Sequence, residues 1–220
     1  MRSRVAAIVV ATLVMIPAGA RPQEQRTIGV PEGGVMVRGW SGRLDEAGGS
    51  LFALRFMAAD GGYQITTGPA AIFWQAGASS IARGQYRLSA TFTQLKPSDH
   101  PNAYGLLFGG SDLGGDNPRY TYFVVREDGK FLLRKRMGKE VPILSDWKDA
   151  SAVNKLDGKG RATNALTVEV GAQRVRFLVN GKEVATQPRS AVDADGFVGL
   201  RVNHNLDVQV TDLQVTTPQS

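Results

Sequence analysis

The chain lacks cysteine, contains only two histidines and carries little excess charge. Without cysteine no disulfide can form, so packing alone must hold the fold. Two histidines and no thiol argue against a zinc ion held by three or four protein ligands. The formal charge of +6 is spread along 220 residues, and its only cluster, Arg134-Lys135-Arg136, would divide between the two faces of a strand. Nucleic acid is therefore not expected as a partner.

A long apolar run occurs only near the N-terminus, where it has the features of an export signal. Arg2 and Arg4 precede the apolar stretch Val5–Ile16, and Ala18-Gly19-Ala20 follows it. The stretch is far shorter than the roughly 20 residues of a membrane-spanning helix, and Ala-Gly-Ala fits a signal-peptidase site. We expect a signal peptide over residues 1–20 and a secreted or periplasmic chain without a membrane span. An uncleaved anchor helix is the alternative interpretation.

The rest of the chain alternates between apolar and polar residues with a period of two. Tyr86–Thr93, Leu166–Val170 and Val175–Val179 follow this pattern, which is typical of half-buried β-strands. The inward-facing set that it predicts is Tyr86, Leu88, Ala90, Phe92, Leu166, Val168 and Val170. Asp146–Lys155 is the one stretch suited to a short helix. Residues 21–34 are polar and rich in proline and glycine, which predicts a flexible arm before a single domain over 35–217.

Two dipeptides ending in glycine mark hairpins. Asp128-Gly129 separates Tyr120–Arg126 from Lys130–Met137, and Asn180-Gly181 follows Val179. Primed hairpin turns need positive φ, which glycine and asparagine tolerate. About ten short strands with glycine-rich turns predict an all-β fold, an antiparallel β-sandwich of the jelly-roll type.

Four segments carry a family resemblance: Leu88–Phe92, Tyr104–Gly109, Val175–Val184 and Gly196–Val215. In this order they resemble strands of laminin-G-like and concanavalin-A-like jelly rolls, above all those of the secreted bacterial family of 3-keto-disaccharide hydrolase domains. The resemblance covers residues 39–215 and implies a jelly roll whose concave sheet meets glycans or keto-glycosides. His204 matches the histidine that follows the family's Gly-Leu strand. The chain departs from the family at residues 122–126 and 163–165.

His204 is the candidate catalytic residue, and Asn203 beside it is a candidate ligand contact. A neutral imidazole at the end of a strand can act as a base or bind a sugar hydroxyl. Asn203-His204-Asn205 is equally suited to building a tight turn, because these residue types tolerate left-handed backbone geometry. Both interpretations stay open on the sequence alone.

A glycine-rich loop over Gly109–Arg119 contains Asp112, Asp116 and Asn117. Their oxygens are of the kind that calcium prefers, so they are the candidate metal ligands. The spacing does not match an EF-hand loop and no second acidic cluster lies near in sequence, so an ordinary solvated hairpin loop explains the segment as well. No other cofactor is expected.

Arg134, Arg136 and Trp147 are the remaining candidate ligand contacts. Arg134 and Arg136 share one strand face, and guanidinium groups suit sugars and carboxylated glycans. We assign this face to Thr121, Phe123, Val125 and Leu132 as well, and the core face to Tyr120, Tyr122, Val124, Leu133 and Met137. Trp147 lies in a polar stretch predicted as a loop, where an indole can stack on sugar rings, whereas Trp40 and Trp74 are assigned to the core.

The sequence therefore predicts a secreted jelly roll that binds carbohydrate or glycoconjugate. One alternative is a hydrolase that acts on 3-keto-glycosides with His204 as the base. Another is a cell-envelope interaction domain without catalysis. The two-carboxylate run that laminarinase-like jelly rolls carry, Glu-x-Asp-x-x-Glu, is absent from the sequence.

Overall fold

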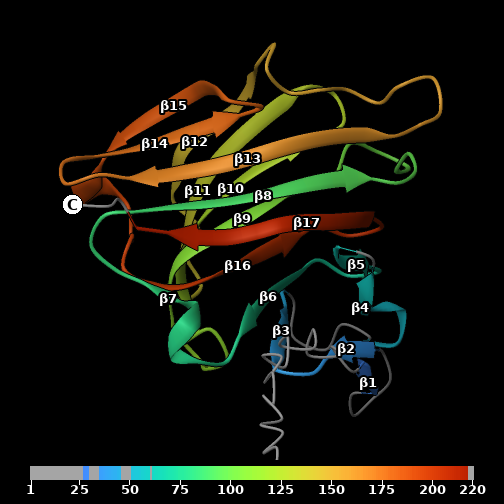
Figure 1. The fold of residues 1–220 in the computed structure, drawn as a ribbon, viewed down its shortest axis with the longest axis horizontal. Helices are drawn as coiled ribbons and strands as arrows, with labels where there is room; N and C mark the ends of the chain where they lie inside the picture. Colours follow the sequence, from blue (N-terminus) through green and yellow to red (C-terminus); the bar gives the residue numbers. More distant parts are fainter. Residues whose placement is uncertain (1–26, 30–34, 46–50, 60, 218–220) are drawn as a thin grey trace, which may run out of the picture.

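The computed structural model describes residues 27–29, 35–45, 51–59 and 61–217, and strands make up most of them (Figure 1). The first strands are β1 (Thr27–Gly29), β2 (Val35–Val37), β3 (Trp40–Leu44), β4 (Arg55–Ala59), β5 (Gly62–Thr66), β6 (Ala71–Gln75), β7 (Ile81–Ala82), β8 (Tyr86–Gln94) and β9 (Ala103–Ser111). The others are β10 (Arg119–Arg126), β11 (Lys130–Met137), β12 (Ile143–Asp149), β13 (Ala162–Val170), β14 (Arg174–Val179), β15 (Lys182–Pro188), β16 (Gly196–Val202) and β17 (Asp207–Thr216).

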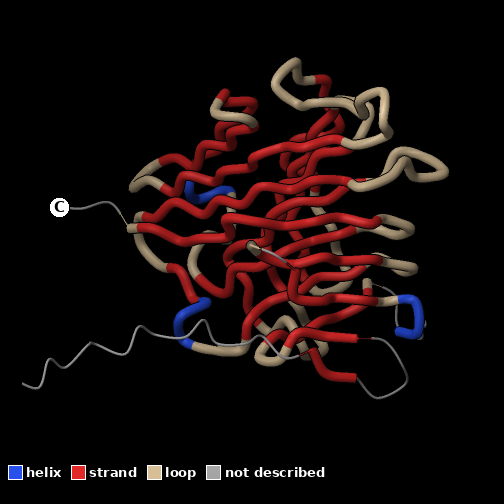
Figure 2. Tube along the Cα trace, turned by 45° about the vertical axis from the view of Figure 1, so that its right-hand side comes forward, coloured by secondary structure: helices blue, strands red, loops and turns tan. Residues whose placement is uncertain are grey.

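Helical structure in the described residues is limited to three short 3-10 turns, η1 (Leu51–Ala53), η2 (Ala78–Ser80) and η3 (Arg189–Ala191), drawn blue in Figure 2. None of the described helices is long and apolar enough to cross a bilayer. The residues predicted as a signal peptide lie outside the described ranges. In the segment predicted as an arm, Thr27–Gly29 forms β1 and pairs with β2, so at least this part belongs to the sandwich.

The strands form two sheets that pack face to face, which confirms the predicted antiparallel sandwich. One sheet has nine strands in the order β1-β2-β4-β5-β17-β8-β13-β14-β15. The other has eight, β12-β11-β10-β9-β16-β6-β3 with β7 paired to β16. Figure 1 shows β13, β8 and β17 in front of β9, β10 and β11. Neighbouring strands are antiparallel apart from a single parallel pairing between β2 and β4.

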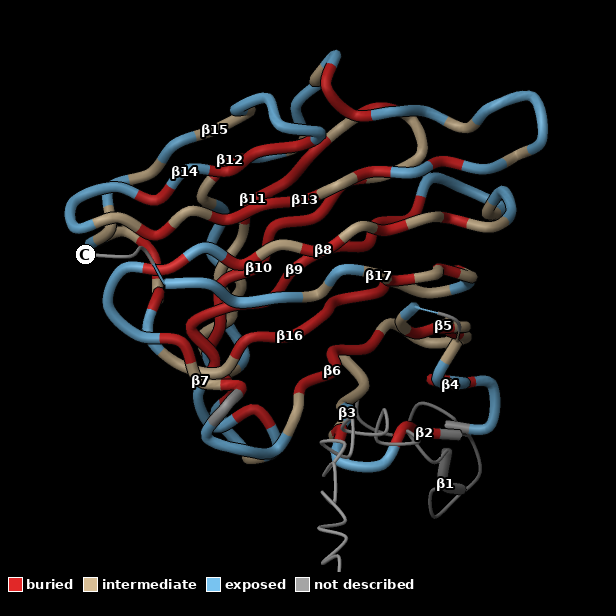
Figure 3. The backbone as a smooth tube through the Cα atoms, viewed as in Figure 1, coloured by how far each residue is buried: buried red, intermediate tan, exposed pale blue. Residues whose placement is uncertain are grey.

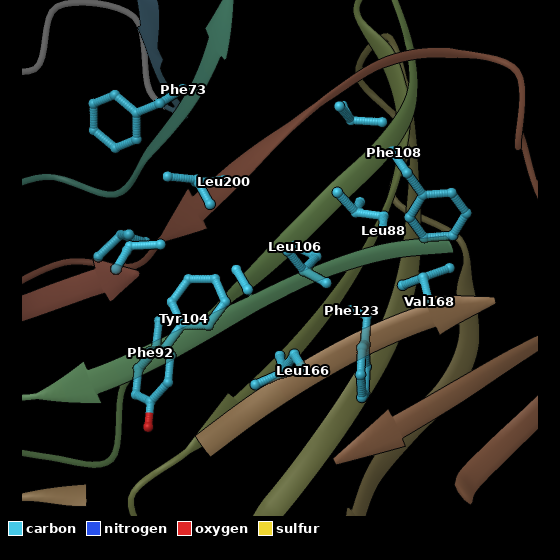
Figure 4. Packing of buried hydrophobic residues seen from close by; sticks show 14 of the residues in the cluster. Phe73, Leu88, Phe92, Tyr104, Leu106, Phe108, Phe123, Leu166, Val168 and Leu200 are labelled. Atoms are coloured by element: carbon cyan, nitrogen blue, oxygen red, sulfur yellow. The ribbon is translucent and has the colours of Figure 1, made fainter. Parts of the chain in front are cut away.

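The core lies between the sheets and has the composition that the alternation predicts. Every residue of the predicted inward set is buried, from Tyr86 in β8 to Val170 in β13. Figure 3 shows the buried positions concentrated along β8, β9, β13 and β16, and Figure 4 shows aromatic and aliphatic side chains of both sheets meeting. A slip of one residue in β8 would expose all four of its apolar groups, so burial fixes the register.

The two predicted hairpins form, but their turns differ. Asn180 and Gly181 have φ of 49° and 78°, as a two-residue primed turn requires. Between β10 and β11, Arg126 pairs with Lys130, which leaves a three-residue loop in which Gly129 adopts a φ of 89°. The predicted strands on either side of Asp128-Gly129 therefore form, but they pair one position away from the pairing that the face assignment supposed.

Two other local predictions are corrected. The stretch suited to a short helix, Asp146–Lys155, forms no helix, and its first four residues belong to β12, which pairs with β11. Trp147 therefore lies on a strand and not in a loop. β9 continues to Ser111, two residues beyond the predicted end, and shortens the following loop to residues 112–118.

Candidate functional site

The outer face of the eight-stranded sheet carries a second apolar cluster, separate from the core. We call it the outer cluster, and its buried members are Ile72, Trp74, Ala103, Leu107, Leu113, Tyr120, Tyr122, Val124 and Leu132. Half-buried Val141, Trp147 and Phe197 pack at its rim. A monomeric sheet facing only water would carry polar residues here, so this face is built differently from an ordinary solvated one.

The register of β10 with β11 places two arginines on this face. Tyr122 pairs with Arg134 and Tyr120 pairs with Arg136, while Phe123 pairs with Leu133 on the core side. Arg134 and Arg136 therefore share a face, as predicted. Tyr120 and Tyr122 lie on this face with them, although both tyrosines were assigned to the core face. The assignment of Tyr120, Tyr122 and Val124 to the core, and of Phe123 and Val125 to the ligand side, was reversed. The three-residue turn is the cause, because it shifts the pairing by one position.

A buried ion pair lies at the centre of this face. Arg201, the last residue but one of the apolar strand β16, donates from Nη1 to Asp45 Oδ1 at 2.8 Å and from Nη2 to Asp45 Oδ2. The guanidinium also lies 4.6 Å from the ring centroid of Tyr122 and within 3.4 Å of the Tyr120 hydroxyl. Its side chain is only 10% exposed. A buried charge needs such a partner, because desolvation is otherwise far too costly.

Burial and charge act in opposite directions on this pair. Burial works to raise the pKa of Asp45, but hydrogen bonding and charge attraction from Arg201, with Arg136 and Arg43 adding to them, outweigh it and hold the pKa below its usual value. Burial also raises the pKa of Tyr120 to about 12, against the opposing charge of Arg201. The aspartate is thus ionised and the phenol neutral at physiological pH.

Arg134 hydrogen-bonds the Tyr122 hydroxyl and still keeps one buried nitrogen that is unpaired within the described part of the chain. Its Nε is buried and has no hydrogen-bond partner among the described residues. Its side chain is 31% exposed, and Nη2 lies 3.9 Å from Oδ1 of the exposed Asp146. Arg136 is more constrained, because its Nε donates to the Gly138 carbonyl. A partly exposed guanidinium is suited to binding a carboxylate, sulfate or sugar hydroxyl.

Trp147 lies at the rim of the outer cluster, against a third arginine of the same face. The guanidinium carbon of Arg126 lies 4.2 Å from its ring centroid, and Arg126 Nε is fixed by Asp128 Oδ1 at 2.8 Å. Trp147 is half-buried, so part of the side chain remains accessible. The arrangement holds an aromatic ring in place next to the Arg126 cation.

The loop over residues 112–118, which carries the candidate metal ligands, also covers one end of the outer cluster. Leu113 is buried in the cluster, and Asp112 Oδ2 accepts from the Asn117 amide at 2.8 Å. A Cβ at Gly115 would lie 1.9 Å from Asp112 Oδ1, so the carboxylate is folded against the loop itself. Asp116 and Asn117 are exposed. Within the described ranges no three His, Cys, Asp or Glu side chains approach closely enough to hold a metal.

His204 and Asn203 lie at the end of the sandwich, away from Arg134. The Asn203 amide donates to the Ala103 carbonyl at 2.8 Å, which extends the pairing of β16 with β9 by one residue. In the β-sheet register, Arg134 stands in the same row as Gly199 of β16, three strands away. Gly199 comes four residues before Asn203. At about 3.3 Å per residue and 4.8 Å per strand, the backbone positions of Arg134 and Asn203 are on the order of 19 Å apart. The structure thus places Arg134, Arg136 and Trp147 on the same outer face, whereas His204 pairs with His100.

Several important residues were not found from the sequence. Arg201 was readable as an unusual feature, because a single arginine in the apolar strand Phe197–Val202 requires a buried partner. Its partner Asp45 is 156 residues away, so no local pattern connects them. Tyr120 and Tyr122 were assigned to the wrong face, and His100 was not connected with His204.

The sequence matches no protein-family model and no curated protein sequence. Solved structures do match. The carbohydrate binding module CBM66 from Bacillus subtilis is 13% identical with a TM-score of 0.58, over 81% of this chain and 96% of the module. A Bacillus subtilis protein of unknown function with a galectin-like fold is 11% identical with a TM-score of 0.56, over 81% of this chain and 89% of that one.

These similarities define the class: a galectin-like or concanavalin-A-like β-sandwich. At such low identity they show the fold and no more, since one fold can carry many functions. The narrower resemblance to 3-keto-disaccharide hydrolase domains finds no support in them.

Proposed function

We propose that this chain binds a carbohydrate or glycoconjugate on the outer face of its eight-stranded sheet. The observation that carries the proposal is Arg134, a partly exposed arginine whose Nε is buried without a partner in the described residues, next to Tyr122 and on the same face as Trp147. The similarity to a carbohydrate binding module supports it at the level of fold alone. The N-terminal signal features support a location outside the cytoplasm, which belongs to the same proposal.

The chemistry of this face matches the needs of sugar recognition. A sugar presents an apolar ring face and several directed hydroxyl groups, so its site combines an aromatic side chain with fixed donors. Trp147 supplies the aromatic surface, and Arg134 supplies the donors. The buried ion pair of Arg201 with Asp45 and the tyrosines form a rigid base beneath them.

The charge of the face favours an acidic glycan. Five arginines belong to it: Arg43, Arg126, Arg134, Arg136 and Arg201. Asp45 neutralises Arg201, Asp128 contacts Arg126, and Asp146 lies at the edge of the range of an ion pair with Arg134. The face keeps an excess of positive charge, which attracts carboxylate or sulfate groups.

A glycan array that includes neutral, carboxylated and sulfated oligosaccharides tests the proposal. Wild type should bind acidic glycans, and Arg134→Ala and Trp147→Ala should each weaken binding about tenfold or more, the scale of a lost charged hydrogen bond or stacking contact. Arg176→Ala is the matched control, because Arg176 is an exposed arginine on the nine-stranded sheet. Equal binding by all three variants and wild type would place the ligand elsewhere.

The same preparation tests the two alternatives. Release of sugar from 3-keto-disaccharides by wild type, lost in His204→Gln, would favour the hydrolase and exclude a purely binding role. Absence of both glycan binding and hydrolysis would contradict the proposal and favour a cell-envelope interaction domain.

A further inference from the structure

The only two histidines of the chain meet at one end of the sandwich. His100 belongs to the connection between β8 and β9, and His204 to the turn between β16 and β17; both connections lie at the right-hand end in Figure 1. Their Nε2 atoms are 2.8 Å apart and their ring centroids 4.9 Å apart. The two imidazoles thus bring residues 104 positions apart in sequence into contact.

We propose that this histidine pair binds a divalent transition-metal ion of intermediate softness, such as Ni²⁺, Cu²⁺ or Zn²⁺. Metal–imidazole bonds are about 2.0–2.1 Å long, so two nitrogens in neighbouring positions at a right angle lie about 2.9 Å apart. The observed Nε2–Nε2 separation of 2.8 Å is close to this value, so each ring needs only to rotate until its Nε2 lone pair points at the ion instead of at the partner ring. Nickel and copper accept such angles readily, and water completes the coordination shell.

The surroundings of the pair are consistent with an open site. His100 is exposed and His204 half-exposed, so an ion can reach both rings. Asn102 Nδ2 and Asn203 Oδ1, which belong to the same two connections, are buried with no partner among the described residues. Buried polar groups are normally satisfied, so these connections hold polar atoms that the described residues leave unpaired.

The backbone around both rings is held independently of any ion. Ser98 Oγ donates to the His100 carbonyl at 2.7 Å, and the backbone N–H of Asn203 donates to the Ala103 carbonyl. The rings are therefore positioned before binding, which reduces the ordering cost. An ion held between them would clamp the β8–β9 connection to the β16–β17 turn.

The proton balance of binding is simple. In the hydrogen-bonded pair one Nε2 carries a proton and the other accepts it, and each neutral ring has one proton in total. A metal needs both Nε2 lone pairs, so the bridging proton moves to Nδ1 of its own ring. Two neutral rings therefore bind the ion without net proton release.

Calorimetry and thermal unfolding with NiCl₂ and ZnCl₂, on protein without a histidine tag, test this proposal. We expect one ion per chain, a melting temperature that rises with metal concentration, and reversal by EDTA. His100→Gln and His204→Gln should each weaken binding at least tenfold. The double variant contains no imidazole, so it controls for binding elsewhere. With Zn²⁺, ¹⁵N spectra should show both Nε2 signals shifting together.

Two results would overturn the proposal. Binding of equal strength by wild type and the double variant would show an adventitious ion only. Absence of metal binding by wild type would show that the pair is only a hydrogen bond, whatever the stability of the variants. Neither result bears on glycan binding, which depends on Arg134 and Trp147 in a different part of the sheet.

Discussion

Replacing Asp45 by asparagine should strongly destabilise the fold. The substitution leaves the Arg201 guanidinium, 10% exposed, above Tyr122 without its counter-charge. Removing one partner of a buried pair typically costs about 3–5 kcal/mol, and because the Asp45 side chain keeps 22% exposure we expect the lower end, about 3 kcal/mol. The excess over a lost hydrogen bond comes from the charge left behind in the apolar surroundings.

Urea unfolding followed by circular dichroism measures this loss of unfolding free energy. The urea concentration at the midpoint should fall, while the dependence of the unfolding free energy on urea concentration stays unchanged. Asp149→Asn is the matched control, because Asp149 is 82% exposed and 3.9 Å from Lys130, and its loss should change stability by less than about 0.5 kcal/mol. An effect of Asp45→Asn no larger than that of the control would refute the description of a buried, mutually dependent pair.

The pH dependence gives an independent check. The folded pKa of Asp45 lies below its unfolded value, so the pair stabilises the fold above the unfolded pKa of about 3.9 and this contribution is lost as the pH falls through the folded pKa. Asp45→Asn should remove that part of the acid destabilisation, and an unchanged acid profile would contradict the assignment.

Three further predictions concern the framework. Asn164→Ala should cost about 3 kcal/mol in urea unfolding, because this buried amide bonds Tyr104 Oη, Asn154 and Asn180 at once; a cost below about 1 kcal/mol would argue against the network. Gly109→Ala should lower stability more than Gly181→Ala, since both have positive φ but only Gly109 would place a Cβ 1.9 Å from the Asp193 carbonyl; equal effects would show that the contact relaxes freely. Burial raises the pKa of Tyr104 and of Tyr120 to about 12 from 10.0, so the unfolded chain loses these protons first and stability should fall as the pH rises from 10 to 12; ultraviolet titration that shows all tyrosines ionising near 10 would contradict it.

Much of the fold could be predicted from the sequence, because several strands carry a clear alternation of apolar and polar residues. The alternation in Tyr86–Thr93 and Leu166–Val170 is a direct consequence of one face meeting the core, and the register follows from burial. Asn180-Gly181 was equally informative, because few other dipeptides adopt two positive φ values.

The site was less readable, for physical reasons. Both faces of β10 are apolar, because one meets the core and the other the outer cluster, so hydrophobicity could not distinguish them. The three-residue turn then decided which residues stand opposite Arg134 and Arg136. The contacts of Arg201 with Asp45 and of His204 with His100 join distant segments, and no local pattern predicts such pairs.

Hydrogen exchange in the presence of the glycan that binds best on the array tests the central proposal most directly. If the outer face of the eight-stranded sheet is the binding surface, backbone amides of β10, β11 and β12 gain protection and those of β13 and β14 do not, and Arg134→Ala removes the gain. Protection confined to the nine-stranded sheet, or unchanged exchange along β10–β12 at saturating glycan, would contradict it.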